Sequence, residues 1–468
     1  MTKSKFGFLK DIRFWIFIFF IIRLYGITDA PLEHSHNWRQ CTGLMVSRNF
    51  LEIDNNILYP RVDDNYGYSG IVGMEFPIMN YIVYLISKVF GFTWWYGRIL
   101  NLIITSIGIF YFFKIIEKFF DKKIAFYSTL VLLSSIWFVF ARKFMPDTFS
   151  LSITIISLWY GFLFLEKGKL IHWGIFFILT FLGIMSKIPA IFLLSLYIIP
   201  IVKEKKINLR RKIIFSFSFI PTILAVWFWY FYWNPHLSNE YHLWYNSGRS
   251  LSEGFYELTN NLNKVAERFY FDGLKSYIGL LTIFLGIFFM IKLLDKLAWA
   301  AILILTSVFF IYMIKSGYFF YHHDYYIIPY VPVMALIAGY GISKINAKLR
   351  FFLIALVIIE SLLNQQHDLT NKLETYRLNL EVISDSISSK SDLIAVNGKG
   401  NPQELFLSHR KGWTLSNENI IDTVTLRNIK EKGCKFIYIN KHECNDKLPK
   451  GFNKVFENED YIIFSINQ

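Results

Sequence analysis

Cysteine is scarce in this sequence, and acidic residues are outnumbered by basic ones. The 468 residues include only three cysteines, Cys41, Cys434 and Cys444, and their spacing excludes a cysteine-based metal site. A disulfide between Cys434 and Cys444 stays an alternative if that part of the chain lies outside the cytoplasm. Aspartate and glutamate number 35 against 49 lysines and arginines, which gives a formal net charge of +14.

This excess of positive charge does not indicate a nucleic-acid partner. A nucleic-acid-binding protein gathers its lysines and arginines on one soluble face. Here the basic residues stand in short stretches between apolar runs. Because basic loops of this kind mark the cytoplasmic side of membrane proteins, the charge indicates topology.

Long apolar runs are the abundant feature. Hydrophobic residues make up 54% of the chain, and many runs approach the roughly 20 residues that a helix needs to cross a bilayer. The run at residues 14–27 lacks the small-residue cleavage site of a secretory signal, so it is expected to remain as a helix. We predict a polytopic membrane protein. Its lysine, asparagine, isoleucine and phenylalanine content is typical of AT-rich bacterial genomes, which favours a bacterial inner membrane.

The basic residues decide the topology at residues 77–92. With the basic N-terminal residues in the cytoplasm, the first helix carries residues 28–94 to the outside. If residues 77–92 crossed the membrane, every later basic loop would face outward, against the positive-inside rule. The stretch is short and is interrupted by Asn80, Ser87 and Lys88, so we predict an interfacial helix.

Counting from there predicts an all-α membrane domain with about eleven transmembrane helices. The predicted spans are residues 14–27, 95–116, 124–141, 148–165, 170–185, 188–202, 213–233, 277–291, 297–314, 326–342 and 351–363. An odd number of crossings places the C-terminus outside the cytoplasm. We therefore expect a membrane domain over residues 1–364 and a small extracytoplasmic α/β domain over residues 365–468.

The α/β domain is predicted from a change of pattern after residue 364. The stretches DLIAVNG, CKFIYIN and YIIFSI are short, apolar and rich in β-branched or aromatic residues, as strands are. The stretch NPQELFLSHR has the periodicity of a helix. Together they indicate a soluble domain of about one hundred residues.

The unusual polar residues all fall on the predicted outer side. Ionisable groups near membrane depth are costly, so they tend to face a cavity and carry function. We expect these residues to converge on one site. The candidates are Asp29, Glu33, His36, Arg39, Gln40, Glu75, Arg142, Asp147, Lys187, His323, Asp324 and Tyr325.

Several of these residues also have purely structural interpretations. Asp147 precedes the apolar run at Thr148 and could serve only as a helix N-cap. Lys187 could extend to the membrane interface. Glu75 could be favoured by the dipole of the helix that follows it, and Arg39 could pair with a local carboxylate.

The run His322-His323-Asp324 leaves a metal site open. Histidine and aspartate are common metal ligands, but adjacent residues rarely ligate one ion together, and a solvated loop explains the run equally well. The sequence requires no cofactor. A divalent metal at the outer cluster of acidic and histidine residues stays an alternative.

Six motifs occur in an order that resembles one family. They are HNWRQ, VGMEFPIMNYIVYLISKVFG, RILN, ARKFMPDTFSL, SKIPA and YHHDYYIIPYVPVMALIAGYG. In this order, over residues 10–345, the chain resembles the GT-C glycosyltransferases. Within them it is most similar to the family 39 group, which includes the protein O-mannosyltransferases and the lipid A aminoarabinose transferases.

The resemblance implies a reaction and two of its residues. Members of the family take a sugar from a polyprenyl phosphate and pass it to an acceptor on the outer side. They use acidic residues of the first outer loop and a later outer aspartate. Asp147 matches the later aspartate, and Glu75 matches the polar position before the proline-headed helix.

One position departs from the family pattern. Many relatives have Asp-Glu followed two residues later by arginine, whereas this chain has His36-Asn37 before Arg39. Three explanations stay open. Asp29 or Glu33 substitutes from the same loop, His36 takes the role of base, or the two matched carboxylates suffice.

We therefore predict a glycosyltransferase that moves a sugar from a polyprenyl-phosphate donor to an envelope glycan, lipid or protein outside the cytoplasm. A carboxylate would take the acceptor's proton, and cations would stabilise charge on the departing phosphate. The catalytic candidates are Asp147, Glu75, Asp29, Glu33 and His36. The candidates for donor phosphate binding are Arg39, Arg142 and Lys187, and those for substrate binding are Gln40, His323, Asp324 and Tyr325.

Two other classes of protein compete with an enzyme. A transporter or flippase of a lipid-linked saccharide would be expected to show an inverted repeat and polar residues on both sides of the bilayer. No such repeat is visible in the sequence, and the predicted cytoplasmic loops are short and merely basic. A non-catalytic scaffold would leave the one-sided polar cluster unexplained.

Overall fold

The structure is a computed structural model of the whole chain. It describes residues 7–33, 35–204, 207–243, 248–370, 374–444 and 448–466, apart from the side chain of Lys203. The chain divides into two compact units. The first comprises residues 1–27, 97–229 and 247–370, and the second comprises residues 28–96, 230–246 and 371–468. The second unit therefore combines the predicted first outer loop with the predicted α/β domain.

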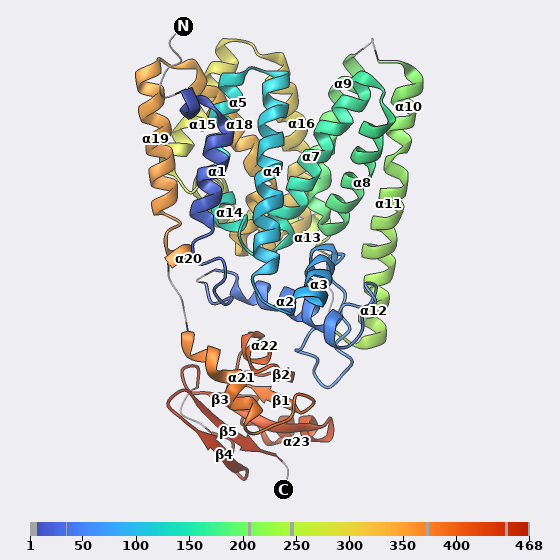
Figure 1. Cartoon of the computed structure of the whole chain (residues 1–468), viewed down its shortest axis with the longest axis vertical. Helices are drawn as coiled ribbons and strands as arrows, with labels where there is room; N and C mark the ends of the chain where they lie inside the picture. The colour runs from blue at the N-terminus through green and yellow to red at the C-terminus, as the bar shows by residue number, and fades with distance from the viewer. Residues whose placement is uncertain are drawn as a thin grey trace. The chain divides into compact units, whose positions relative to one another are not determined.

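Apolar helices make up the first unit, and its long helices run side by side (Figure 1). A helix satisfies its backbone hydrogen bonds within itself, so apolar runs of this kind fold as helices when no water is near. The helical elements are η1 (Gly7–Lys10), α1 (Ile12–Arg23), α4 (Tyr96–Phe119), α5 (Lys122–Ser134), α6 (Trp137–Phe140), α7 (Pro146–Lys167), α8 (Leu170–Ser186), η2 (Ile188–Tyr197), α9 (Ile198–Lys203), α10 (Leu209–Phe217), α11 (Phe219–Val226), η3 (Trp227–Trp233), α13 (Leu251–Thr259), α14 (Leu262–Glu267), η4 (Arg268–Asp272), α15 (Tyr277–Lys292), α16 (Lys296–Ser316), α17 (Tyr318–His322), η5 (Asp324–Tyr330), α18 (Val331–Lys344), α19 (Ala347–Leu363) and α20 (His367–Thr370).

The helices identify a multi-pass membrane protein. Among the described residues, five helices are long and apolar enough to cross a membrane, or six if one bent pair counts as a single span. The five are Tyr96–Phe119, Pro146–Lys167, Leu209–Tyr241, Lys296–Ser316 and Asp324–Lys344. Every predicted span overlaps helical chain, although residues 24–27 of the first span are turns. Several of these helices are short or interrupted, as where Ser135 separates α5 from α6. The count of eleven crossings stays a prediction.

The limits of α7, which carries Asp147, follow from its sequence. Pro146 lies in the first turn, where a missing backbone N–H costs little. At the other end Gly168 adopts a left-handed conformation, with φ at 71°, and stops the helix. Most side chains between these two residues are buried, and α7 packs on α8 and η2.

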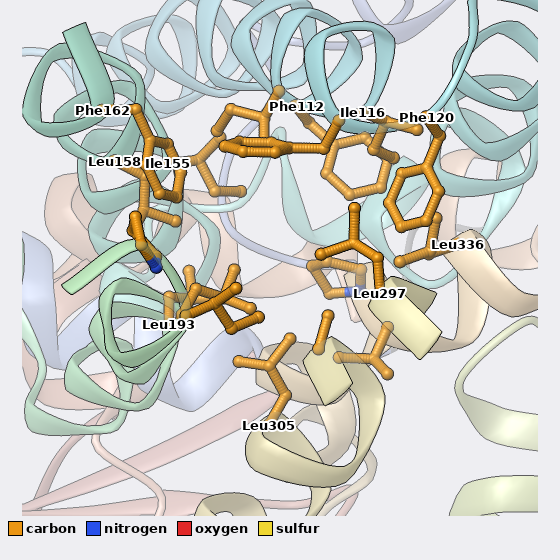
Figure 2. A pocket seen from close by; sticks show the side chains of 18 residues that line it. Phe112, Ile116, Phe120, Ile155, Leu158, Phe162, Leu193, Leu297, Leu305 and Leu336 are labelled. Carbon is orange, nitrogen blue, oxygen red and sulfur yellow. The ribbon is translucent and has the colours of Figure 1, made fainter. Parts of the chain in front are cut away.

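An apolar pocket lies within the first unit, well away from Asp147. Figure 2 shows rings and aliphatic chains that point into a common space, among them Phe112 of α4, Leu158 of α7, Leu193 of η2 and Leu305 of α16. Leu158 follows Asp147 by about three helical turns, or roughly 16 Å. Because all the residues that line it are apolar, this pocket is not a place where a phosphate would be bound.

Two stretches of the first unit, Leu262–Asp272 and Tyr277–Lys292, meet at a bend of 87°. Lys275 occupies the corner in a left-handed conformation, with φ at 52°. Ser276 caps the helix that follows by accepting a hydrogen bond from its backbone. The first two N–H groups of that helix donate to the carboxylate of Glu360 on α19, both at 3.0 Å. The bend is therefore fixed by side chains of the same unit.

The second unit contains the helices of the first loop and of the C-terminal region. They are α2 (Asn37–Glu52), α3 (Ile78–Phe90), α12 (Asn234–Tyr241), η6 (Thr375–Asn379), α21 (Leu380–Asp385), α22 (Gln403–Ser408) and α23 (Thr423–Glu431). With 13 residues, α3 is shorter than the roughly 20 that a transmembrane helix needs. α3 is among the shorter apolar helices of the chain, and its interfacial position stays a prediction.

A five-stranded mixed sheet forms the C-terminal part of this unit, in the order β2-β1-β3-β5-β4. β1 is parallel to both of its neighbours, whereas β5 is antiparallel to both of its own. The three predicted strands and the predicted helix α22 are confirmed. Two strands were not predicted, because β2 is only four residues long and contains a glycine, and β4 is mostly exposed. The strands are β1 (Leu393–Val396), β2 (Lys411–Thr414), β3 (Cys434–Asn440), β4 (Asn453–Glu457) and β5 (Tyr461–Ser465).

Cys434 is free. Cys434 is buried among the apolar side chains of the sheet, whereas Cys444 is partly exposed. The alternative of a Cys434–Cys444 disulfide is therefore wrong.

Candidate active site

Asp147 and Lys187 form an ion pair where α7 begins and α8 ends. Lys187 Nζ lies 2.5 Å from Asp147 Oδ1. The exposed fractions of the two side chains are 4% for Asp147 and 12% for Lys187, so water has little access to the pair. Among the residues that the structure describes, the other carboxylate oxygen of Asp147, Oδ2, has no hydrogen-bond partner. One oxygen is held by the lysine, and the other can accept a proton.

The purely structural interpretations of this pair do not fit its geometry. The N-cap of α7 is Met145, and Asp147 lies inside the first turn. The interpretation of Asp147 as an N-cap is therefore wrong, although a negative charge in the first turn favours the helix. Lys187 turns toward Asp147 in the interior and does not extend outward.

Aromatic rings lie beside the Lys187 ammonium. Its nitrogen is 5.2 Å from the ring centroid of Tyr325 and 5.9 Å from that of Tyr326. The ring of His323 stacks near Tyr325, with centroids 5.3 Å apart. Because the face of an aromatic ring attracts a cation, the tyrosines help to fix the ammonium. The structure thus brings four of the predicted site residues together: Asp147, Lys187, His323 and Tyr325.

Asp324 contacts a different cation. Its Oδ2 lies 3.3 Å from Lys275 Nζ, which also lies 2.9 Å from Asp272 Oδ1. Asp272 in turn pairs with Arg268. The predicted role of Asp324 in substrate binding stays a prediction, because this contact is with the protein itself.

Two more cations follow α6. Arg142 Nη2 donates to the backbone carbonyl of Tyr25 at 2.7 Å. Lys143 Nζ lies 3.5 Å from Asp368 Oδ1. Arg142 and Lys143 are both buried. The predicted binding of the donor phosphate by Arg142 stays a prediction.

The histidine run forms no metal centre in the part of the chain that the structure describes. No group of three or more histidine, cysteine, aspartate or glutamate side chains there could hold a metal ion. The rings of His322 and His323 meet edge to face, at 83° and 4.7 Å between centroids. No metal is assigned to the site.

In the second unit, Arg39 pairs with Glu75. Arg39 Nη2 lies 2.5 Å from Glu75 Oε1, and the two side chains are 30% and 24% exposed. Arg39 thus pairs with a carboxylate of the same unit that lies 36 residues away in the sequence and is itself a catalytic candidate. Unlike the Asp147–Lys187 pair, this one is accessible to a ligand from solvent. The predicted binding of the donor phosphate by Arg39 stays a prediction.

The backbone on each side of Glu75 is held by one chain segment. The side-chain amide of Asn234 donates to the carbonyl of Met74 at 2.8 Å. The backbone N–H of Phe76 donates to the hydroxyl of Tyr230 at 3.4 Å. Since Asn234 and Tyr230 are both buried, they fix the place from which the Glu75 side chain extends.

The remaining first-loop candidates lie around the start of α2. Gln40 is fully buried and donates to Glu33 Oε2 at 2.9 Å. His36 precedes the helix in a left-handed conformation, with φ at 60°, and its side chain does not cap it. Asp29 is partly buried in the same unit. The predicted roles of these four residues stay predictions.

Two neighbouring carboxylates of the second unit differ in their surroundings. Asp63 is paired with Arg48 at 2.6 Å and accepts a hydrogen bond from Asn49 at 2.9 Å. Asp64 Oδ1 is buried with no hydrogen-bond partner among the described residues, and burial raises the pKa of Asp64 to about 7. The fold thus raises the pKa of the Asp64 carboxyl to near neutral pH.

Several residues that support the candidates were not predicted from the sequence. Lys275, Asp272 and Arg268 were not singled out, although three charges so close to an apolar run are a signal that could have found them. Tyr230 carries no such signal, because it lies in the aromatic end of the predicted span 213–233, and Asn234 directly follows that span.

The two carboxylates matched to the family belong to different units. Asp147 lies in the first unit and Glu75 in the second. A single site shared by Asp147 and Glu75 therefore stays a prediction.

Comparison with known proteins places this geometry in a known architecture. Residues 75–235 match the family described as dolichyl-phosphate-mannose-protein mannosyltransferase. ArnT from Cupriavidus metallidurans bound to undecaprenyl phosphate has a similar structure, with a TM-score of 0.61 at 12% identity over 96% of this chain and 98% of that one. The chain has the GT-C fold. This confirms the resemblance predicted from the motifs.

A second GT-C glycosyltransferase shares the architecture. The archaeal oligosaccharyltransferase AglB from Archaeoglobus fulgidus, in complex with an inhibitory peptide and a dolichol-phosphate, matches with a TM-score of 0.57 at 10% identity. The match covers 93% of this chain and 70% of AglB. No curated protein sequence matches the chain. At these identities the similarity shows a shared GT-C fold, and the substrates of ArnT and AglB are not assigned to this chain.

Proposed function

We propose that this protein is an integral-membrane glycosyltransferase that moves a sugar from a polyprenyl-phosphate donor to an envelope glycan, lipid or protein. The proposal includes its place, a bacterial inner membrane, with the reaction on the extracytoplasmic side. The observation that carries it is the buried Asp147–Lys187 pair, in which Oδ1 of the carboxylate is held and Oδ2 is not. The GT-C fold and the polyprenyl and dolichol phosphates bound by ArnT and AglB support it.

The reaction forms a bond from an acceptor oxygen or nitrogen to the anomeric carbon of the sugar and breaks the bond from that carbon to the phosphate. The acceptor's proton passes to a carboxylate, for which Asp147 Oδ2 is suitably placed in a buried setting. The polyprenyl phosphate leaves with the electron pair. A cation stabilises the negative charge that builds on it; Lys187 is paired with Asp147, and Arg39 is the other candidate.

The experiment that tests this proposal is the substitution Asp147→Asn. The amide would keep the shape of the side chain but could not take a proton, so transfer from a polyprenyl-phosphate sugar should fall by about 10²- to 10⁴-fold. Glu75→Gln should give a similar defect if the two carboxylates share one site. The double variant should then be little worse than either single one, because residues that act as a unit are not additive.

Two outcomes would count against the assignment. Near-wild-type transfer by the Asp147→Asn variant would move the base to Glu75, Asp29, Glu33 or His36. Movement of a labelled lipid-linked saccharide across proteoliposomes, with no transfer to any acceptor, would favour the alternative of a flippase.

A further inference from the structure

Four charged side chains form a compact network at the bend of the first unit. Lys275 lies between two carboxylates, 2.9 Å from Asp272 and 3.3 Å from Asp324, and Asp272 also pairs with Arg268. The exposed fractions are 15% for Lys275, 8% for Asp272, 23% for Asp324 and 11% for Arg268. Two positive and two negative charges cancel, which is what makes burial of all four tolerable.

The backbone fixes where the Lys275 ammonium lies. Lys275 is the corner residue of the 87° bend, and its left-handed φ of 52° is uncommon for a residue with a side chain. Its N–H donates to Phe271 at 2.7 Å, and its carbonyl accepts from Asn364 at 3.0 Å. The chain keeps this strained conformation because both sides of the corner are bonded.

The network reaches the candidate site through one short segment. Asp324 is the direct neighbour of Tyr325, whose ring lies 5.2 Å from Lys187 Nζ. Arg268 donates to the carbonyls of Phe320 at 3.2 Å and Tyr321 at 2.6 Å. The network therefore holds residues 320–324 at both ends, immediately before the ring that contacts Lys187.

We propose that Lys275 is a positioning residue for glycosyl transfer: it fixes Asp324, and thereby the Tyr325 ring that orients the Lys187 ammonium against Asp147. This inference rests on the proposed function. Lys275 does not itself touch the pair. Replacing Lys275 should displace the Lys187 ammonium relative to Asp147, although neither Asp147 nor Lys187 is itself changed.

The first test compares Lys275→Met with Lys275→Arg. The methionine variant should lower kcat about 10- to 100-fold, since small displacements of a reacting group have effects of this size. KM for the lipid-linked donor should change less than kcat, because a displaced ammonium loses most of its effect on the charge that builds on the phosphate in the transition state. The arginine variant should recover most of kcat by restoring the positive charge. Lys292→Met is the matched control, since Lys292 is an exposed lysine at the far end of α15.

A double variant separates positioning from simple charge balance. Lys275→Met with Asp324→Asn leaves Arg268 paired with Asp272, so the network is neutral again. Its melting temperature should return close to that of the wild type, while kcat should remain low. Recovery of kcat together with stability would overturn the proposal, because compensation of charge would then be the whole role of Lys275.

A readout independent of activity distinguishes this inference from the proposed function. The rate at which an amine-reactive reagent modifies Lys187, followed by mass spectrometry, should rise several-fold in the double variant and stay unchanged in Lys292→Met. An unchanged rate in the double variant would overturn the inference, whatever the activity. If the wild-type protein transfers no sugar, a raised rate in the double variant would still support the positioning of Lys187 by Lys275, while the proposed function of the site would be defeated.

Discussion

The amide of Asn234 donates a hydrogen bond of 2.8 Å to the carbonyl of Met74, the residue directly before Glu75. Replacing Asn234 by alanine would remove this part-buried hydrogen bond, at a cost of about 0.5–1.5 kcal/mol. If Glu75 takes part in transfer, the Asn234→Ala variant should transfer sugar more slowly than the wild type, because the backbone before Glu75 is no longer held. Transfer rates and melting temperatures of the variant would be measured together.

Asn239 provides the matched control for this experiment. It lies on α12 with Asn234 but is exposed. Asn239→Ala should leave both transfer and stability close to the wild type. Equal effects of the two substitutions would show that α12 as a whole, and not the hydrogen bond to Met74, supports Glu75.

Lys187→Ala should destabilise the first unit as well as abolish transfer. It would leave the Asp147 carboxylate buried without its cation, and breaking one side of a buried pair commonly costs about 3–5 kcal/mol. Thermal unfolding in detergent would show the lowered melting temperature. Lys169→Ala, at the exposed start of α8, should have almost no effect; a similar loss there would mean that alanine in the flanks of α8 is harmful in itself.

Asp64→Asn should change how stability depends on pH. Burial raises the pKa of Asp64 from 3.8 to about 7 in the folded protein, so the folded state binds this proton more tightly than the unfolded state does. The stability that this proton contributes is present below about pH 4 and is lost as the pH rises to about 7. The asparagine variant should therefore melt higher than the wild type at about pH 8, with a smaller difference at about pH 5.

Asp54→Asn serves as a comparison of opposite sign. A hydrogen bond from Arg61 chiefly lowers the pKa of Asp54, so its contribution is present above the unfolded pKa and is lost on acidification. Asp54→Asn should lower the melting temperature slightly at about pH 8. A rise at that pH in both variants would contradict the explanation by burial of Asp64.

The predicted topology is open to a direct test. A reporter fused after Lys123 should be cytoplasmic, and one fused after Asp392 should be extracytoplasmic. The reason is that the predicted spans place all the basic loops on the cytoplasmic side. Alkaline phosphatase and green fluorescent protein fusions report the two sides. A cytoplasmic signal from the second fusion would place the C-terminal region opposite to the proposed site.

Sequence pattern predicted those parts of the fold that depend on local chemistry. Apolar runs located the helices, and Gly168 and Pro146 mark the ends of α7 as their backbone preferences require. The short strand β2 was not predicted because it depends on pairing with β1. The two strands approach so closely that a Cβ at Gly412 would lie 1.9 Å from the carbonyl oxygen of Ile394 on β1. Pairing between strands, and not the residues alone, defines such an element.

In the candidate site, too, the residues could be predicted from local sequence, but their contacts could not. Asp147 and Lys187 stood out as ionisable residues beside apolar runs, and the structure pairs them. Their partner Tyr325 was proposed from its place in the motif, but its contact with Lys187 depends on how η5 packs. Lys275 was missed because its importance comes from a backbone corner and from two carboxylates, one of them 49 residues away in the sequence.

The carboxylate of Glu360 completes the start of α15, directly after the bend at Lys275. The start of a helix leaves several N–H groups without intrahelical partners, and within hydrocarbon each of them would be costly. Glu360 accepts from the first two N–H groups of α15, and Ser276 accepts from the third, that of Gly279. The first three N–H groups of α15 are thus bonded to side chains of the same unit, so the chain can turn into the predicted span at residue 277 without needing water to complete the start of the helix.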